Sequence, residues 1–167
     1  FLLALESVGA SEFGSSNNYA ASDLKKAVDK WFEDMGKRGL DNAKLIPREI
    51  DLTTLDGSGC YGKLSVKAAP LTLDEARKYA DIIPNAERWC WLATGWSGPS
   101  KSDGDLALYV NSNGGWGLNY CSNSYGIRPA LKVPSILFED SEAGLDLSKI
   151  PTDDLLQEIH RRLAEKA

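Results

Sequence analysis

Apolar positions in the first third of the chain recur at the spacing of an amphipathic helix. From residue 24 onward they follow the i, i+3, i+4, i+7 pattern, at Leu24, Ala27, Val28, Trp31, Phe32 and Met35. Ser22 comes before them, and its hydroxyl can accept a hydrogen bond from a free N–H of the first turn. Gly36 or Gly39 can end the helix, because glycine readily adopts the left-handed conformation found there. The pattern therefore predicts a helix that begins after Ser22.

A second helical pattern begins at the letters "TLDE". Thr72 and Glu75 have the spacing of a capping box, in which the two residues exchange side-chain to backbone hydrogen bonds. The apolar stripe that follows consists of Leu73, Ala76, Tyr79, Ala80 and Ile83. Pro84 comes next, and a proline inside a helix removes a hydrogen bond and clashes with the preceding turn. We expect a second helix that Pro84 stops.

Beyond this point the pattern changes from the helical period to the alternation of strands. Residues 88–133 read as short antiparallel strands at "WCWLAT", "DLALYV", "GWGLNY" and "GIRPALKV". The letters "NSNGG" between the second and third of these predict a hairpin. Shorter strand-like pieces occur in residues 1–5 and 44–70. The sequence predicts an α+β fold with two helices, small antiparallel sheets and long loops, all within a domain of residues 1–138.

The end of the chain predicts a separate element. Residues 139–150 form an acidic linker, and residues 151–167 form an amphipathic C-terminal helix that Thr152 can cap. Its apolar stripe must lie against the domain or against another chain. We expect it to support homo-oligomerisation through Ile150, Leu155, Ile159 and Leu163.

Charge and composition exclude several classes of function. The formal net charge is −5, and Lys and Arg do not cluster among aromatic residues, so we expect no nucleic-acid partner. No apolar run has the roughly 20 residues that a membrane span requires. The three cysteines, Cys60, Cys90 and Cys121, fit neither a disulfide framework nor the spacing of zinc ligands. Because the first residue is Phe, we expect the chain to be a fragment or a processed product.

The search for catalytic chemistry finds little. The one histidine, His160, lies among charged residues of the terminal helix, where a solvated surface position is the favoured interpretation. The sequence contains no phosphate-binding loop, dinucleotide fingerprint or HExxH motif. Asp103 and Asp105 in "KSDGD" can bind a divalent cation or form a solvated turn, and the turn is favoured. We therefore expect no enzyme activity, no cofactor and no bound metal.

A different feature of residues 93–125 suggests recognition. Rigid aromatic side chains occur there among Ser, Asn and Gly, which is the composition of binding surfaces. Strand alternation assigns Leu106, Leu108 and Val110 to a core-facing side, and it places Trp116 and Tyr120 on one face, where some of the aromatics should be core. Trp96 and Tyr109 are the favoured surface anchors. The predicted ligand-binding residues are Trp96, Ser97, Lys101, Asp103, Tyr109, Asn111, Asn113, Trp116, Asn119, Tyr120 and Asn123.

Three segments, taken in order, resemble a known family. They are "FGSSNNYAASDLKKAVDKWF", "LTLDEARKYADIIPNAERWCWLAT" and "SYGIRPALKV", and the resemblance covers about residues 1–135. It is to a domain family of unknown function from Gram-positive gut bacteria and their phages. The resemblance implies a C-type-lectin-like fold, of the branch that includes the formylglycine-generating enzymes and the variable proteins of diversity-generating retroelements. In those variable proteins the region equivalent to about residues 93–125 is displayed to a ligand.

The chain departs from two groups that share this fold. Cys90 and Cys121 do not reproduce the copper-binding cysteine motif of the formylglycine-generating enzymes, so their oxidase activity is not implied. The calcium-associated motifs "EPN", "QPD" and "WND" of sugar-binding C-type lectins are missing from the sequence, so calcium-dependent sugar binding is not implied either.

The stretch "NSYGIRPALKVP" carries two residues that are unusual in a buried strand. An arginine is rarely buried without a partner, and a proline cannot donate a ladder hydrogen bond. We expect Arg128 to be partly buried and paired with a carboxylate or loop carbonyls, and Pro129 to lie at a strand start or edge. With Trp91, these two residues are predicted to be structural.

Two hypotheses follow. The first is a non-catalytic receptor or adhesion module that presents residues 93–125 to a protein or cell-surface ligand, and a retroelement-diversified variable protein is one form of this hypothesis. The second is a structural component of a phage particle or surface assembly that oligomerises through the C-terminal helix. Both favour the extracellular surface or the virion as the location.

Overall fold

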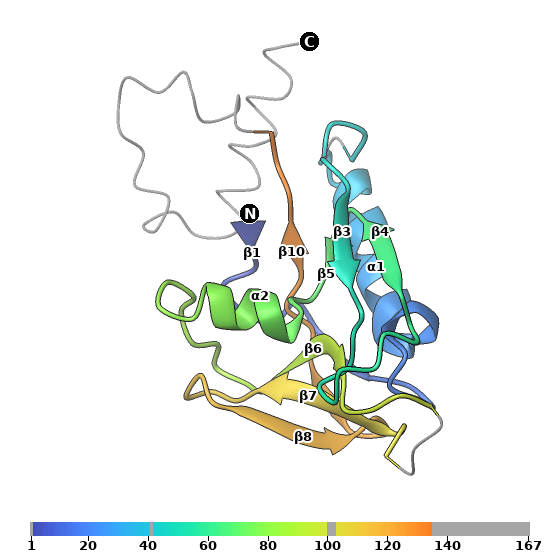
Figure 1. The fold of residues 1–167 in the computed structure, drawn as a ribbon. Helices are drawn as coiled ribbons and strands as arrows, with labels where there is room; N and C mark the ends of the chain where they lie inside the picture. The colour runs from blue at the N-terminus through green and yellow to red at the C-terminus, as the bar shows by residue number, and fades with distance from the viewer. Residues whose placement is uncertain (1, 41, 100–102, 135–167) are drawn as a thin grey trace.

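The computed structural model describes residues 2–40, 42–99 and 103–134, which form an α+β fold with two α-helices and three small sheets (Figure 1). The first helix, α1 (Asp23–Lys37), follows a short 3₁₀ turn, η1 (Tyr19–Ala21). The Ser22 hydroxyl accepts a hydrogen bond from the Lys25 N–H at 2.9 Å, as a helix cap does. Gly39, with a φ of 101°, follows the C-cap. The predicted helix is confirmed, and of the two candidate glycines it is Gly39 that lies at its end.

The second helix, α2 (Leu73–Lys78), is shorter than the sequence predicts. Its capping box is present, with the side chains of Thr72 and Glu75 each accepting a hydrogen bond from the backbone N–H of the other. The expected stripe reaches Ile83, but Tyr79 is already the C-cap and the chain continues in turns. The N–H groups of Ile82 and Ile83 both donate to the Tyr79 carbonyl at 3.0 Å, and this turn does not continue because a proline disfavours the helical conformation of the residue before it. As a result the side chain of Ile82 is 77% exposed.

A five-stranded sheet contains most of the tryptophan-rich region. Its strand order is β2 (Ala10–Glu12), β9 (Ser124–Gly126), β6 (Cys90–Gly95), β7 (Leu106–Val110) and β8 (Trp116–Tyr120). β7 and β8 form the predicted antiparallel hairpin. The turn between them is closed by Asn111, whose Oδ1 accepts the N–H groups of Asn113 and Gly115, each at 2.9 Å.

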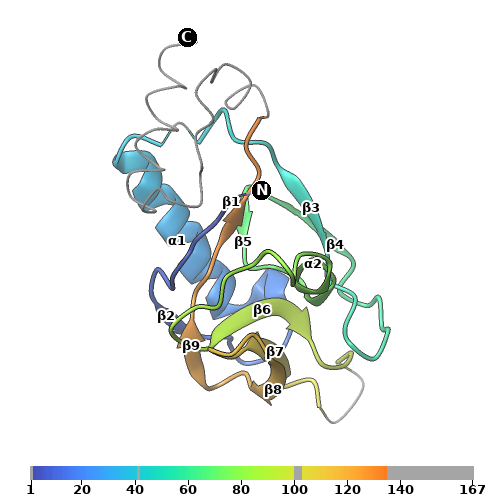
Figure 2. The same ribbon diagram turned by 90° about the vertical axis from the view of Figure 1, so that its left-hand side faces the viewer.

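A three-stranded sheet joins the two ends of the described chain. β10 (Ala130–Leu131) lies between β1 (Leu2–Leu3) and β5 (Ala68–Ala69), antiparallel to both. Figure 2 shows α1 on one side of these strands and the hairpin of β3 (Arg48–Asp51) and β4 (Lys63–Val66) on the other. "GIRPALKV" is therefore not one strand. Its Gly126 ends β9, and the chain crosses at Ile127–Pro129 to enter β10.

The strand β6 divides the core in two. All six of its residues are buried. Because successive side chains of a strand point to opposite faces, Trp91 and Ala93 join the larger cluster with Phe13 and Leu24, whereas Leu92 joins a smaller one. The smaller cluster lies between α2 and the sheet and consists of Leu71, Leu73, Ala76, Leu92, Leu108 and Ala130.

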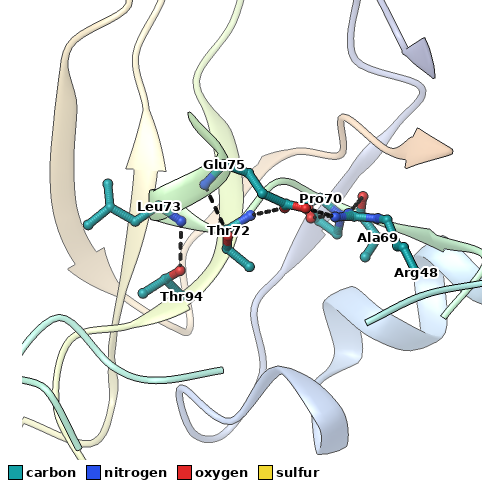
Figure 3. Close-up of polar contacts among 7 residues, drawn as sticks. All are labelled: Arg48, Ala69, Pro70, Thr72, Leu73, Glu75 and Thr94. Atoms are coloured by element: carbon teal, nitrogen blue, oxygen red, sulfur yellow. Dashed lines mark hydrogen bonds and ion pairs between the residues drawn. The ribbon is translucent and has the colours of Figure 1, made fainter. Parts of the chain in front are cut away.

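A buried arginine connects α2 to the three-stranded sheet. The Nη2 of Arg48 donates hydrogen bonds to the carbonyls of Ala69 and Pro70, both at 2.9 Å, and its Nη1 forms an ion pair with Glu75. Figure 3 shows the Glu75 carboxylate between Arg48 and Thr72, whose N–H it accepts at 2.9 Å. Glu75 therefore caps the helix and also pairs with a buried charge. Its sequence position indicates the first role but not the second.

Several predictions lie outside the described residues. They are the acidic linker, the C-terminal helix and the oligomerisation residues Ile150, Leu155, Ile159 and Leu163. Within the described ranges, no helix is long and apolar enough to cross a membrane.

We predict that Glu75→Ala lowers the free energy of unfolding by about 3 kcal/mol, because it removes the carboxylate partner of a buried arginine together with half of the capping box. Asp74→Ala is the matched control on the same helical turn. The Asp74 side chain is 88% exposed and its contact with Arg77 is 3.6 Å long, so the loss should stay below about 1 kcal/mol. Urea denaturation of the two variants measures the difference, and equal losses would contradict the prediction.

Candidate binding surface

The outer strand of the tryptophan-rich sheet carries a row of exposed apolar side chains. The pairing of β7 with β8 places Trp116 opposite Val110, Leu118 opposite Leu108 and Tyr120 opposite Leu106. The face that Leu108 shares with these side chains packs toward α2, and Leu108 itself is only 3% exposed. β8 lies one strand further out and ends the sheet. Trp116, Leu118 and Tyr120 are 44%, 36% and 58% exposed, and we call these three residues the β8 strip.

The opposite face of the same hairpin holds Tyr109 in an aromatic cluster. Its ring is stacked on Trp89 with centroids 4.8 Å apart, and it meets the ring of Tyr125 edge-on at 5.1 Å. Gly117 makes this possible, since a Cβ there would lie 2.5 Å from the Tyr109 hydroxyl. Tyr109 is therefore half-buried between neighbours. The expected order of exposure is wrong: the sequence favours Tyr109 as a surface anchor over Trp116 and Tyr120, and the structure has the reverse.

Trp96 and its neighbours lie at the far end of β6, away from Trp116 at the start of β8. The Nε1 of Trp96 makes a long hydrogen bond of 3.4 Å to the Asp103 carboxylate, and the ring is half-buried. Ser97 is only 2% exposed, and its carbonyl accepts the Nδ2 of Asn17 at 2.9 Å. A ligand contact from Ser97 requires an accessible side chain, and the structure buries it. Lys101 lies outside the described residues.

The predicted asparagines mostly order turns. Asn111 closes the β7–β8 turn, as described above. The Nδ2 of Asn119 donates to the Tyr125 hydroxyl, and its Oδ1 accepts the Nδ2 of Asn123 at 3.0 Å. Asn113 is exposed beside the strip. Of the predicted ligand-binding residues that the structure describes, those that are exposed are Asn113, Trp116 and Tyr120.

The residues predicted to be structural are buried. Trp91 is 1% exposed, packs edge-on against Phe13 and donates its Nε1 to the Ser11 carbonyl at 3.0 Å. Arg128 is 8% exposed and donates its Nε to the Ala4 carbonyl at 2.7 Å. Pro129 immediately precedes β10, where its missing N–H breaks no ladder bond.

Sequence reasoning missed two features of this surface. Leu118 was left out of the predicted set, although the alternation of "GWGLNY" already placed it between Trp116 and Tyr120. The second feature is a cleft of about 70 Å³ between α2, the loop after it and the β7–β8 turn. Trp116 lies at its rim, with the Arg77 guanidinium 5.4 Å from the centre of the Trp116 ring. No single stretch of sequence indicates the cleft, because its walls come from distant segments.

In the described part of the chain, no group of three or more His, Cys, Asp or Glu side chains lies so that it could hold a metal ion. Burial raises the pKa of the Cys121 thiol to about 12, and Asp105 acts in the same direction. Burial also raises the pKa of Cys90. Cys60, in contrast, is exposed.

Comparisons of the chain with protein-family models, with curated proteins and with solved structures found no match.

We predict that one of the three thiols of the native protein reacts quickly with a disulfide reagent at about pH 8. The thiolate is the reactive form, so a raised pKa and burial both slow Cys90 and Cys121, while exposed Cys60 reacts. Absorbance of the released thiol counts the reacted groups, and all three should react in denaturant. Cys60→Ser should abolish the fast phase, and a fast phase that survives this substitution would contradict the assignment.

Proposed function

We propose that the chain is a non-catalytic ligand-binding module that docks a protein partner on the β8 strip. The observation that carries the proposal is the alignment of Trp116, Leu118 and Tyr120 on one exposed strand. Among the described residues, eight large apolar side chains are exposed, and three of them belong to this strand. Exposed apolar residues scattered singly are ordinary, whereas a contiguous group is typical of an interaction site.

The chemistry of the strip favours a protein as the ligand. Tryptophan and tyrosine are the residues that most often dominate binding energy at protein interfaces, and polar neighbours around them exclude water. Asn113 and Arg77 are exposed polar residues near Trp116. Within the described residues β8 has β7 as its one neighbour in the sheet, so an edge of its backbone there is also available to a partner strand.

We further propose that the scaffold is C-type-lectin-like, as the family resemblance implies. The two helices, the small and mostly antiparallel sheets and the long loops support this assignment. The position of the strip is also compatible with a retroelement-diversified protein. Substitutions at exposed positions usually change stability by less than about 0.5 kcal/mol, so residues 116, 118 and 120 can vary without loss of the fold.

We predict that the double substitution Trp116→Ala with Tyr120→Ala weakens ligand binding at least about 100-fold, because truncating an aromatic anchor typically costs 2 kcal/mol or more. An array of purified cell-surface protein ectodomains identifies ligands of the wild-type chain, and biolayer interferometry then gives the dissociation constant of each variant. Near-ultraviolet circular dichroism verifies that the variant is folded.

The matched control removes exposed apolar side chains elsewhere. Val8 and Leu55 are 37% and 36% exposed and do not belong to the strip, so Val8→Ala with Leu55→Ala should bind like the wild type. Undiminished binding by the Trp116 and Tyr120 variant would remove the strip from the site. Equal losses in both double variants would indicate non-specific apolar adhesion instead.

A further inference from the structure

The cleft beside α2 is mostly apolar and combines a buried floor with an exposed rim. Its floor includes the buried residues Leu71, Trp91 and Leu92, and Ala76 of α2 forms part of a wall. The rim is formed by exposed residues of the loop after α2 and of the β7–β8 turn, namely Ala80, Pro84, Asn85 and Trp116. A concave apolar surface with a few polar groups is the usual form of a small-molecule site.

Arg128 lines this cleft and has few partners. The residue is 8% exposed, and its single hydrogen bond among the described residues is the one from Nε to the Ala4 carbonyl. Its Nη2 is buried with no hydrogen-bond partner in the described structure. A guanidinium carries five N–H donors and stays protonated in proteins, so a buried one with a single bond is costly.

The environment of Arg128 contrasts with that of Arg48, the other buried arginine of the described chain. Arg48 has the Glu75 carboxylate and two carbonyls as partners. In the described part of the chain, no carboxylate is hydrogen-bonded to Arg128. Glu6 contributes to its electrostatic environment, but the Oε2 of Glu6 accepts the N–H of Glu87 instead.

The charge of the cleft has one sign. Of the residues that the structure describes, the charged side chains that line it are Arg88 and Arg128, and no described Asp or Glu is among the lining residues. This is notable in a chain whose formal net charge is −5. The cleft therefore has a positive, poorly solvated floor surrounded by apolar walls.

From these observations we propose that the cleft binds a small organic carboxylate with a short apolar body, its carboxylate on Arg128 and its body against Leu71, Leu92 and Ala76. One guanidinium matches the planar edge of a carboxylate with two parallel N–H···O bonds. The volume of about 70 Å³ suits a body of a few carbon atoms, since an engineered cavity of roughly 150 Å³ binds benzene. The site is distinct from the protein-docking strip but adjoins it, because Trp116 belongs to the strip and also forms part of the rim of the cleft.

The test is a titration of the full chain with butyrate, followed by two-dimensional ¹H–¹⁵N NMR that includes the arginine Nε–Hε signals. Butyramide is the matched probe, because it has the same shape and lacks the charge. Butyrate should give saturable shifts at the cleft residues and at the Arg128 Nε–Hε signal, with butyramide at least about tenfold weaker. Inorganic phosphate tests whether any anion suffices.

Two variants separate ligand binding from a structural role of Arg128. Arg128→Met should lower butyrate affinity at least about tenfold. Because this variant also loses the bond to Ala4, Ala80→Phe provides a second test that fills the cleft from an exposed position and should abolish binding in a folded protein. Arg38→Gln removes an exposed arginine that does not line the cleft and should bind butyrate like the wild type.

Four results would overturn the proposal. Equal affinity for butyrate and butyramide would indicate an apolar cavity without a carboxylate site, and phosphate binding as tightly as butyrate would indicate a general anion site. Unchanged butyrate binding in Ala80→Phe would place the ligand elsewhere. Shifts that do not saturate in the wild-type chain would show that the cleft is not a site for this class of ligand.

Discussion

The arrangement of residues 2–134, as far as the structure describes them, depends on the burial of both faces of β6. A strand that is covered on each side requires two separate sets of apolar partners, and the chain supplies them from distant segments. Trp91 and Ala93 are covered by the cluster that contains Phe13 and α1. Leu92 is covered by α2 and by residues near β10. β6 is central in its sheet, β7 lies next to it and β8 lies beyond β7, so β8 is the edge strand of the described sheet. The exposed strip is thus a geometric consequence of where the core is placed.

Two buried arginines show how the fold treats charge. Arg48 has a carboxylate and two carbonyls as partners, and these bonds fix α2 against the three-stranded sheet. Among the described residues, Arg128 has one carbonyl as its hydrogen-bond partner. A buried charge that is paired with a carboxylate is compensated, whereas a buried charge without one costs stability unless something else satisfies its donors. The same residue type therefore indicates a structural anchor at one position and a candidate ligand contact at the other.

Much of the local structure could be predicted from the sequence. The cap at Ser22, the capping box of Thr72 with Glu75 and the hairpin at "NSNGG" all occur where the sequence placed them. Alternation also assigned Trp116 and Tyr120 to the same face. What it could not assign was which part of that face is covered. Leu108 and Leu118 are paired neighbours on that face, yet Leu108 is buried in the cluster that contains Leu73 and Ala76 of α2, whereas Leu118 lies outside that cluster and is exposed.

The sequence by itself determined the elements whose hydrogen bonds close within a few residues, because a cap or a tight turn needs its donor and acceptor in one short window. Those elements include both helix starts and the β7–β8 hairpin. Only the tertiary structure decided the split of "GIRPALKV" between two sheets, the exposure of the β8 strip and the walls of the Arg128 cleft. Each of these depends on contacts between residues far apart in the chain, such as Arg128 with Ala4 and Ala130 with Leu3. A local pattern records which face of an element is apolar, and packing decides which segment covers that face.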